Sequence, residues 1–158
     1  DIFKIALSKG DKFIPVSKEL DFVKSYLYIQ NIRFDGKIKY YIQADEELMN
    51  YPVIKLLLQP FVENAVYHGI EPKIGDGTIG IKVYQKDDRI CFEISDDGVG
   101  MESEDALQKG YAVRNSIERI RLIYGENAEV KFYSRLNEGT KVQISFTKEK
   151  DNVQNSID

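Results

Sequence analysis

"TIGIKVYQKDDRICFEISDDGVG", residues 78–100, contains the pattern that decides the fold class. Apolar and polar residues alternate over 78–85 and again over 89–95, which predicts two β-strands. The polar residues 86–88 between them predict a hairpin turn, so the two strands should be antiparallel neighbours. Two acids and two glycines follow the second strand, one glycine more than a tight turn requires.

Helical and strand patterns alternate on both sides of this hairpin. Apolar residues at helical spacing predict helices over 17–34 and 52–69, and a third from 113 to Gly125. Further strands are predicted at 37–45, 128–134 and 140–146, the last two joined as a second hairpin around residues 137–139. This order predicts an α+β fold, a two-layer sandwich of a mostly antiparallel mixed sheet with three helices on one face. A Rossmann fold is disfavoured, because its glycine motif opens a helix within a parallel βαβ unit.

Ser17 and two prolines mark the expected helix boundaries. Ser17, shortly after Pro15, is a candidate N-cap for the first helix. Pro52 stands at a helix-entry position, and Pro60 should kink or restart the second helix.

The composition limits the class of protein. With 158 residues, the chain has the size of one ordinary domain. The 22 basic and 26 acidic residues give a net charge of −4, and no stripe of Lys and Arg could neutralise a phosphate backbone. Nucleic acid is therefore not an expected partner.

Cys91 is the single cysteine, which excludes a disulfide framework and favours a reducing compartment. No apolar run approaches the length of a membrane span.

The second predicted helix carries polar residues in the otherwise apolar stretch "LLLQPFVENAVYHG". Asn64 and His68 are four residues apart and so share a helix face. Taken singly, each is more often a buried side chain satisfied by the backbone. Together they could line a ligand pocket. An Asn oxygen can be the single protein ligand of Mg²⁺ when nucleotide phosphates and waters supply the other ligands.

The loop after the hairpin can be interpreted as a base-binding element. Asp96 ends a strand, where its carboxylate could accept a hydrogen bond from an exocyclic amino group such as that of adenine. Gly98 and Gly100 have no Cβ and would let the backbone approach the ring closely. An irregular acidic turn could have the same sequence, so the motif alone does not decide between the two.

Two further glycine positions lie downstream. Gly110 precedes the third helix, where free backbone N–H groups and the helix dipole favour phosphate, and Arg114 adds a positive charge. Gly139 and Thr140 enter the last strand and by themselves would indicate only a hairpin turn.

The order of these elements resembles the Bergerat-type ATP-binding fold shared by sensor histidine kinases, DNA gyrase, heat-shock protein 90 and mismatch-repair ATPases. Within that superfamily, three stretches are similar to YesM/LytS-type bacterial sensor histidine kinases: "SKELDFVKSYLYIQNIRF", "LQPFVENAVYHGIEPK" and "GYAVRNSIERIRLIYG". The resemblance extends from Leu7 to Phe146, nearly the whole chain.

The resemblance implies ATP and Mg²⁺ as cofactors and suggests roles for individual residues. Asn64 corresponds to the Mg²⁺-binding asparagine and Asp96 to the adenine-binding aspartate. His68 falls where the family places a ring or base near the nucleotide. The positions that match the family's glycine boxes are Gly98, Gly100, Gly110, Gly139 and Thr140. Tyr67 stands where other histidine kinases often have Lys or Arg, which removes one expected phosphate contact.

The resemblance also implies a domain organisation and partners. Residues 1–14 would be the tail of a preceding dimerisation and phosphoacceptor region, 15–148 the catalytic domain, and 149–158 a polar, disordered tail. The expected partners are an upstream phosphoacceptor helix, in the same protein or its dimer mate, and a response regulator. The chain would be the cytoplasmic domain of a membrane-anchored homodimer in the bacterial inner membrane.

Three functions are compatible with this resemblance. A histidine kinase domain would deliver the γ-phosphoryl of Mg-ATP to a histidine elsewhere, because His68, the only histidine, lies on the nucleotide-binding helix. An ATPase needs a general-base glutamate one turn before Asn64, where this chain has Pro60. Glu63, the remaining candidate base, is adjacent to Asn64 and turned roughly 100° away from it. The third function is a regulatory nucleotide-binding domain without catalysis, which the full set of nucleotide residues disfavours.

Overall fold

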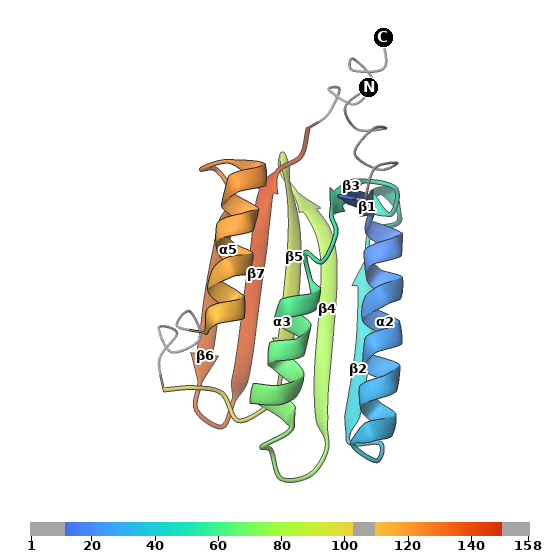
Figure 1. Cartoon of the computed structure of the whole chain (residues 1–158), viewed down its shortest axis with the longest axis vertical. Coiled ribbons are helices and arrows are strands. Elements are labelled where there is room, and N and C mark those ends of the chain that lie inside the picture. Colours follow the sequence, from blue (N-terminus) through green and yellow to red (C-terminus); the bar gives the residue numbers. More distant parts are fainter. Residues whose placement is uncertain (1–11, 103–109, 150–158) are drawn as a thin grey trace.

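The structure, a computed structural model, describes residues 12–102 and 110–149 (Figure 1). Its helices are α2 (Val16–Arg33), α3 (Gln59–Asn64) and α5 (Tyr111–Tyr124), with a 3₁₀ turn η1 (Glu46–Leu48) and a π-helical turn η2 (Ala65–Ile70) that continues α3. Its strands are β1 (Phe13–Pro15), β2 (Ile38–Ala44), β3 (Pro52–Ile54), β4 (Gly77–Lys86), β5 (Arg89–Asp96), β6 (Glu129–Arg135) and β7 (Gly139–Thr147).

Five strands form the main sheet in the order β2-β4-β5-β7-β6, and the three helices cover one of its faces (Figure 1). β2 and β4 are parallel, and the other three neighbouring pairs are antiparallel. The predicted α+β sandwich and the two predicted hairpins, β4–β5 and β6–β7, are therefore confirmed. A separate antiparallel pair, β1 with β3, was not predicted.

The core lies between this sheet and the helices. Alternate residues of β4 and β5 face the helices and are buried: Ile79, Ile81, Val83, Ile90, Phe92 and Ile94. The helices bury the residues that helical spacing predicts: Leu20, Val23 and Leu27 in α2, and Val113, Ile117 and Ile120 in α5. Because Asp96 comes two residues after Ile94, its side chain leaves β5 on the same helix-covered face.

The prediction of a continuous helix over 52–69 is wrong for the first half of that range. Pro52–Ile54 forms β3, and α3 begins only at Gln59. Leu56, between them, has a φ of 66°, which a continuous right-handed helix does not allow. Pro60 lies in the first turn of α3, where its missing N–H breaks no helical hydrogen bond. Pro60 therefore lies at the start of the helix, and it neither kinks nor restarts an earlier one.

The N-cap predicted at Ser17 is also wrong. α2 begins at Val16, and no side chain caps it. Instead, the N–H groups of Val16 and Ser17 donate to the backbone carbonyls of Tyr51 and Met49, each at 2.9 Å. The segment before β3 thus satisfies the free amides of the first helical turn.

The predicted tails at 1–14 and 149–158 fall mostly outside the described residues. Phe13 and Ile14 are described and belong to β1, which pairs with β3. At the other end, the Glu149 N–H donates to the Tyr51 hydroxyl at 3.3 Å, which ties the residues after β7 to the segment before β3.

Candidate functional site

Asp96 is half-buried at the end of β5. The Gly98 N–H donates to its Oδ1 at 2.9 Å, and the backbone N–H of Thr140 also donates to the carboxylate. Burial, with a smaller contribution from Asp97, raises the pKa of Asp96 to about 6 against the lowering effect of these amides and of Lys73. The carboxylate is thus incompletely stabilised, and a further N–H donor from a ligand would suit it.

Gly98 and Gly100 pack the loop after β5 against other parts of the backbone. A Cβ on Gly98 would collide with the backbone of Gly69, and a Cβ on Gly100 with the carbonyl group of Arg135. The Val99 N–H between them donates to the Gly69 carbonyl at 3.1 Å. The space that these glycines leave is therefore filled by protein backbone, rather than kept open for a ligand ring as the sequence suggested.

The β6–β7 turn packs against the backbone of Asp96. Gly139 has a φ of 109°, and a Cβ there would collide with the Asp96 carbonyl group. The hydroxyl of Ser134, a residue only 8% exposed, lies 2.7 Å from the Thr140 hydroxyl and accepts a hydrogen bond from the Met101 N–H at 2.9 Å. Ser134 was not predicted from the sequence. Its inward position in the alternating strand was the available signal, because a buried hydroxyl needs a partner.

Asn64 is the last residue of α3, at the point where the helix widens into the π-helical turn η2. In an α-helix, residues five apart are rotated by roughly 140° from each other. The i→i+5 hydrogen bonds of a π turn bring Asn64 and Gly69 closer to one line. A Cβ on Gly69 would lie 2.6 Å from Asp96 Oδ1. Gly69, which the sequence marked only as a helix end, thus joins the Asn64 helix to the Asp96 site.

The polar side chains of this helix differ in exposure. Asn64 is half-buried, and its side chain makes no hydrogen bond to another described residue, so its oxygen is free to bind a ligand. His68 is exposed. Glu63 is also exposed and accepts a hydrogen bond from Gln59 Nε2 at 3.4 Å. Burial is the main cause of the raised pKa of Tyr26 in α2, and Glu63 is close enough to contribute to it. Glu63 therefore lies on the α2 side of its helix.

Gly110 and Arg114 lie at the start of α5. Gly110 is the N-cap residue and has an extended backbone, as predicted for a helix entry. Arg114 is exposed and lines a groove of about 230 Å³ that Val130 of β6 also lines. Neither Asp96 nor Asn64 lines this groove. A phosphate contact by Gly110 or Arg114 stays a prediction.

A cavity of about 430 Å³ lies beside Asp96 at the β6–β7 turn. Three of its lining residues, Ser95, Tyr133 and Lys141, are register neighbours whose side chains lie on the sheet face without helices. Three others, Asp96, Ser134 and Thr140, are register neighbours on the helix-covered face, so residues of both sheet faces line the cavity. Asn64 does not line it.

The described residues contain no dedicated metal cage. No group of three His, Cys, Asp or Glu side chains within 12–102 and 110–149 could hold a metal ion. A metal ion here would rely on the oxygen of Asn64 and on ligands brought by a nucleotide, which is a coordination that Mg²⁺ accepts. In the same ranges, no helix has the length and apolar character needed to cross a membrane.

Two sequence families match the chain. Residues 50–150 match the histidine kinase-, DNA gyrase B- and HSP90-like ATPase family, and residues 1–38 match a family described as histidine kinase. The sensor histidine kinase YesM of Bacillus subtilis is 30% identical over 135 residues, which are 84% of this chain and 23% of YesM. The sensor protein kinase HptS of Staphylococcus aureus is 26% identical over 164 residues, covering 96% of this chain and 31% of HptS. The chain thus spans less than a third of the length of these relatives.

Solved structures of histidine kinases share the fold. The blue-light activated histidine kinase EL346 of Erythrobacter litoralis has a TM-score of 0.66 at 23% identity, covering 84% of this chain and 42% of that one. The histidine kinase AdeS of Acinetobacter baumannii has a TM-score of 0.65 at 12% identity, covering 87% and 67%. The ATPase-family match contains Asn64, Asp96 and Thr140 and covers more than half of the chain. The chain therefore belongs to the histidine kinase-, DNA gyrase B- and HSP90-like ATPase family.

Proposed function

We propose that the chain is the ATP-binding catalytic domain of a sensor histidine kinase, an enzyme that phosphorylates a protein histidine. The observation that carries the proposal is the half-buried carboxylate of Asp96, whose pKa is raised to about 6 although two backbone amides donate to it. A charged carboxylate in this setting gains from another N–H donor, and the exocyclic amino group of adenine is such a donor. The similarity to YesM and HptS supports a kinase over other members of the family.

Asn64 would bind the Mg²⁺ that accompanies the nucleotide. Its oxygen has no partner among the described residues, and the π turn connects it through Gly69 to Asp96. When bound, Mg²⁺ would neutralise negative charge on the phosphates. His68 would lie near the nucleotide on the same helix. The groove that holds Arg114 does not support a phosphate contact by that residue.

The phosphoryl acceptor would be a histidine on an upstream helix of the same protein or of its dimer mate. His68, the only histidine of the chain, belongs to the nucleotide-binding helix, and an acceptor must instead be brought in line with the γ-phosphate from outside. The match of residues 1–38 to the histidine kinase family supports a neighbouring phosphoacceptor region. The whole protein would be a homodimer anchored in the bacterial inner membrane, with this domain in the cytoplasm, and would feed a response regulator.

Nucleotide binding is tested by titration with a fluorescent ATP analogue or by calorimetry. Asp96→Ala removes one charge-assisted hydrogen bond and should weaken binding by about ten- to a hundredfold. Asp76→Ala is the matched control, because Asp76 is exposed and, among the described residues, forms an ion pair only with exposed Lys39, at 3.7 Å. Unchanged affinity in a folded Asp96→Ala variant would refute the adenine site.

Catalysis is tested with γ-labelled ATP and Mg²⁺. We expect slow hydrolysis and no labelling of the chain alone, and acid-labile labelling of the upstream segment once that segment is supplied. Label on His68 would contradict its assignment to the pocket. Rapid hydrolysis without transfer would favour the ATPase alternative, even though Pro60 occupies the position of its general base.

A further inference from the structure

The helix that carries Asn64 is capped by a side chain from another element. Its own N-cap residue, Leu58, provides no side-chain cap. Instead, the N–H groups of Leu58 and Leu56 donate to the two carboxylate oxygens of Glu19, at 2.9 and 3.1 Å. Glu19 belongs to α2 and is only 1% exposed. Its carboxylate satisfies free amides at the helix start and lies at the positive end of the helix dipole.

The opposite end of this helix is held by a cation from the same part of the chain. Lys37, between α2 and β2, donates from Nζ to the carbonyl oxygens of Glu71 at 2.9 Å and Lys73 at 2.5 Å, just beyond η2. Free carbonyl groups and the negative end of the helix dipole favour a positive charge there. Glu19 and Lys37 thus match the two ends of one helix with opposite charges.

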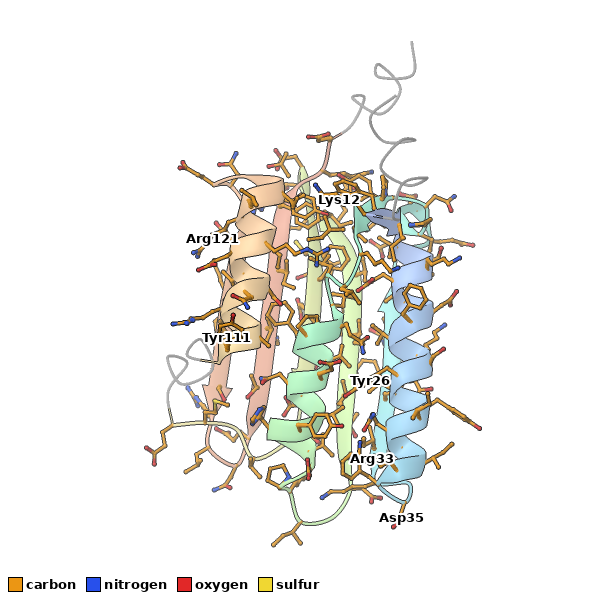
Figure 2. The ribbon with its side chains drawn as sticks, in the orientation of Figure 1. Lys12, Tyr26, Arg33, Asp35, Tyr111 and Arg121 are labelled. Atoms are coloured by element: carbon orange, nitrogen blue, oxygen red, sulfur yellow. The ribbon has the colours of Figure 1, made fainter. Side chains whose placement is uncertain are left out.

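Between these ends, α2 also contacts the last turn of the helix. The Tyr67 hydroxyl donates to Gln30 Oε1 at 3.3 Å and accepts from Arg33 Nη1 at 3.2 Å. The Tyr67 ring packs edge-on against Phe34, with ring centroids 6.2 Å apart. Figure 2 shows Tyr26 and Arg33 on the side of α2 that faces α3. The hydroxyl of Tyr67 is therefore engaged with α2.

These contacts join two segments that match different sequence families. The residues that contact the Asn64 helix from α2 and the turn after it, from Glu19 to Lys37, lie within 1–38, which matches the histidine kinase family. Asn64 and Asp96 lie within 50–150, which matches the ATPase family. The Asn64 helix is therefore held at both ends by the segment of histidine kinase type.

We propose that Glu19 and Lys37 are positioning residues that set how Asn64 is presented to a nucleotide bound at Asp96. This inference rests on the function proposed above, in which Asn64 ligates the Mg²⁺ of the nucleotide. Asp96 is fixed in the sheet, whereas the place of Asn64 depends on how its helix is held. A displacement of the helix by about 1 Å would misplace the metal ligand relative to the base site, which is enough to impair a site of this kind.

The test is a double-mutant cycle between Glu19→Gln and Asn64→Ala. Gln keeps one carbonyl oxygen but replaces the second acceptor with an NH₂ group, so one of the two amides loses its partner. The Kd for ATP is measured by calorimetry with Mg²⁺ and with EDTA. Glu19→Gln should weaken Mg-ATP binding about three- to tenfold, change metal-free binding less than about twofold, and add nothing once Asn64 is replaced.

Lys37→Gln should give the same pattern, and it carries the test alone if thermal melting shows that Glu19→Gln does not fold. Asp21→Asn and Lys39→Gln are matched controls, because both residues are exposed and, within the part of the chain that the structure describes, neither forms a hydrogen bond or ion pair with the Asn64 helix. Equal losses with Mg²⁺ and with EDTA, or a Glu19→Gln effect that persists in the Asn64→Ala background, would overturn the inference. A wild-type chain that binds no nucleotide would instead overturn the proposed function itself.

Discussion

Replacing Asp96 with Asn should stabilise the nucleotide-free domain at neutral pH while weakening nucleotide binding. Burial raises the pKa of Asp96 to about 6, against 3.8 for an exposed aspartate. At pH 7 the folded chain therefore holds a negative charge that would be better solvated in the unfolded chain. Asn has nearly the same shape, and its side-chain oxygen can still accept from the Gly98 N–H, but it carries no charge.

The size of the stabilisation by Asp96→Asn follows from the two pKa values. A carboxyl group whose pKa is raised by folding binds its proton more tightly in the folded state, so stability falls as the pH rises from about 3.8 to about 6 and is level above that. The difference of about 2 units corresponds to about 3 kcal/mol. Loss of the Thr140 N–H hydrogen bond, about 1–1.5 kcal/mol, offsets part of this gain. The variant should thus be about 1–2 kcal/mol more stable than wild type at pH 7.5, and no more stable near pH 4.

The measurement is urea unfolding of wild type and Asp96→Asn at about pH 4.5 and about pH 7.5. The difference in free energy of unfolding between the two proteins should change by about 2 kcal/mol between these conditions. Asp76→Asn, at an exposed position, is the matched control. If the Asp96→Asn difference is the same at both pH values, the carboxylate is not desolvated in the folded chain and the reasoning fails.

Three further substitutions test the site. Asn64→Ala should weaken Mg-ATP binding far more than metal-free ATP binding in calorimetry, and equal losses would leave Asn64 without a metal role. Gly98→Ala should destabilise the fold by about 3 kcal/mol or more, because its Cβ would overlap the backbone of Gly69, and an unchanged melting temperature would contradict that packing. Ser134→Ala should cost about 1–3 kcal/mol in urea unfolding, because the Met101 N–H loses its acceptor, and a loss within error of zero would show that water replaces it.

The sheet and two of the helices could be predicted because each has one buried face. Apolar residues then recur every second residue in β4, β5 and β7, and at helical spacing in α2 and α5. The place of Asp96 at the end of β5 was predictable for the same reason. Asp96 continues the inward alternation of Ile94 but is polar, so it marks the point where the strand leaves the core.

The segment 53–58 could not be predicted from its pattern. Val53, Ile54, Leu57 and Leu58 are all buried, so the stretch has no polar face and its periodicity does not distinguish a strand from a helix. β3 is short, and its partner β1 lies far away in the sequence, so no local signal indicates the pairing. The π turn that aligns Asn64 with Gly69 likewise has no sequence pattern of its own.

Glu19 shows a different limit of prediction from the sequence. In the sequence it is one of several charged residues on an amphipathic helix, and such a residue is usually exposed. Its role depends on Leu56 and Leu58, which follow nearly forty residues later and present unpaired amides only because β3 ends and α3 begins there. A buried carboxylate of this kind is recognised only once the two segments are placed side by side.

The glycines of the Asp96 loop show what a motif can and cannot indicate. The spacing predicted that the missing Cβ atoms at positions 98 and 100 make room for a ligand ring, whereas the backbone of Gly69 and Arg135 fills that space. The difference bears on how binding would work. Because the loop is held by contacts with η2 and the β6–β7 turn, Asp96 is placed by the protein itself, and a nucleotide would not have to order this part of the site. The geometry that a ligand must still meet is then the relation between Asp96 and Asn64, which the ends of the Asn64 helix control.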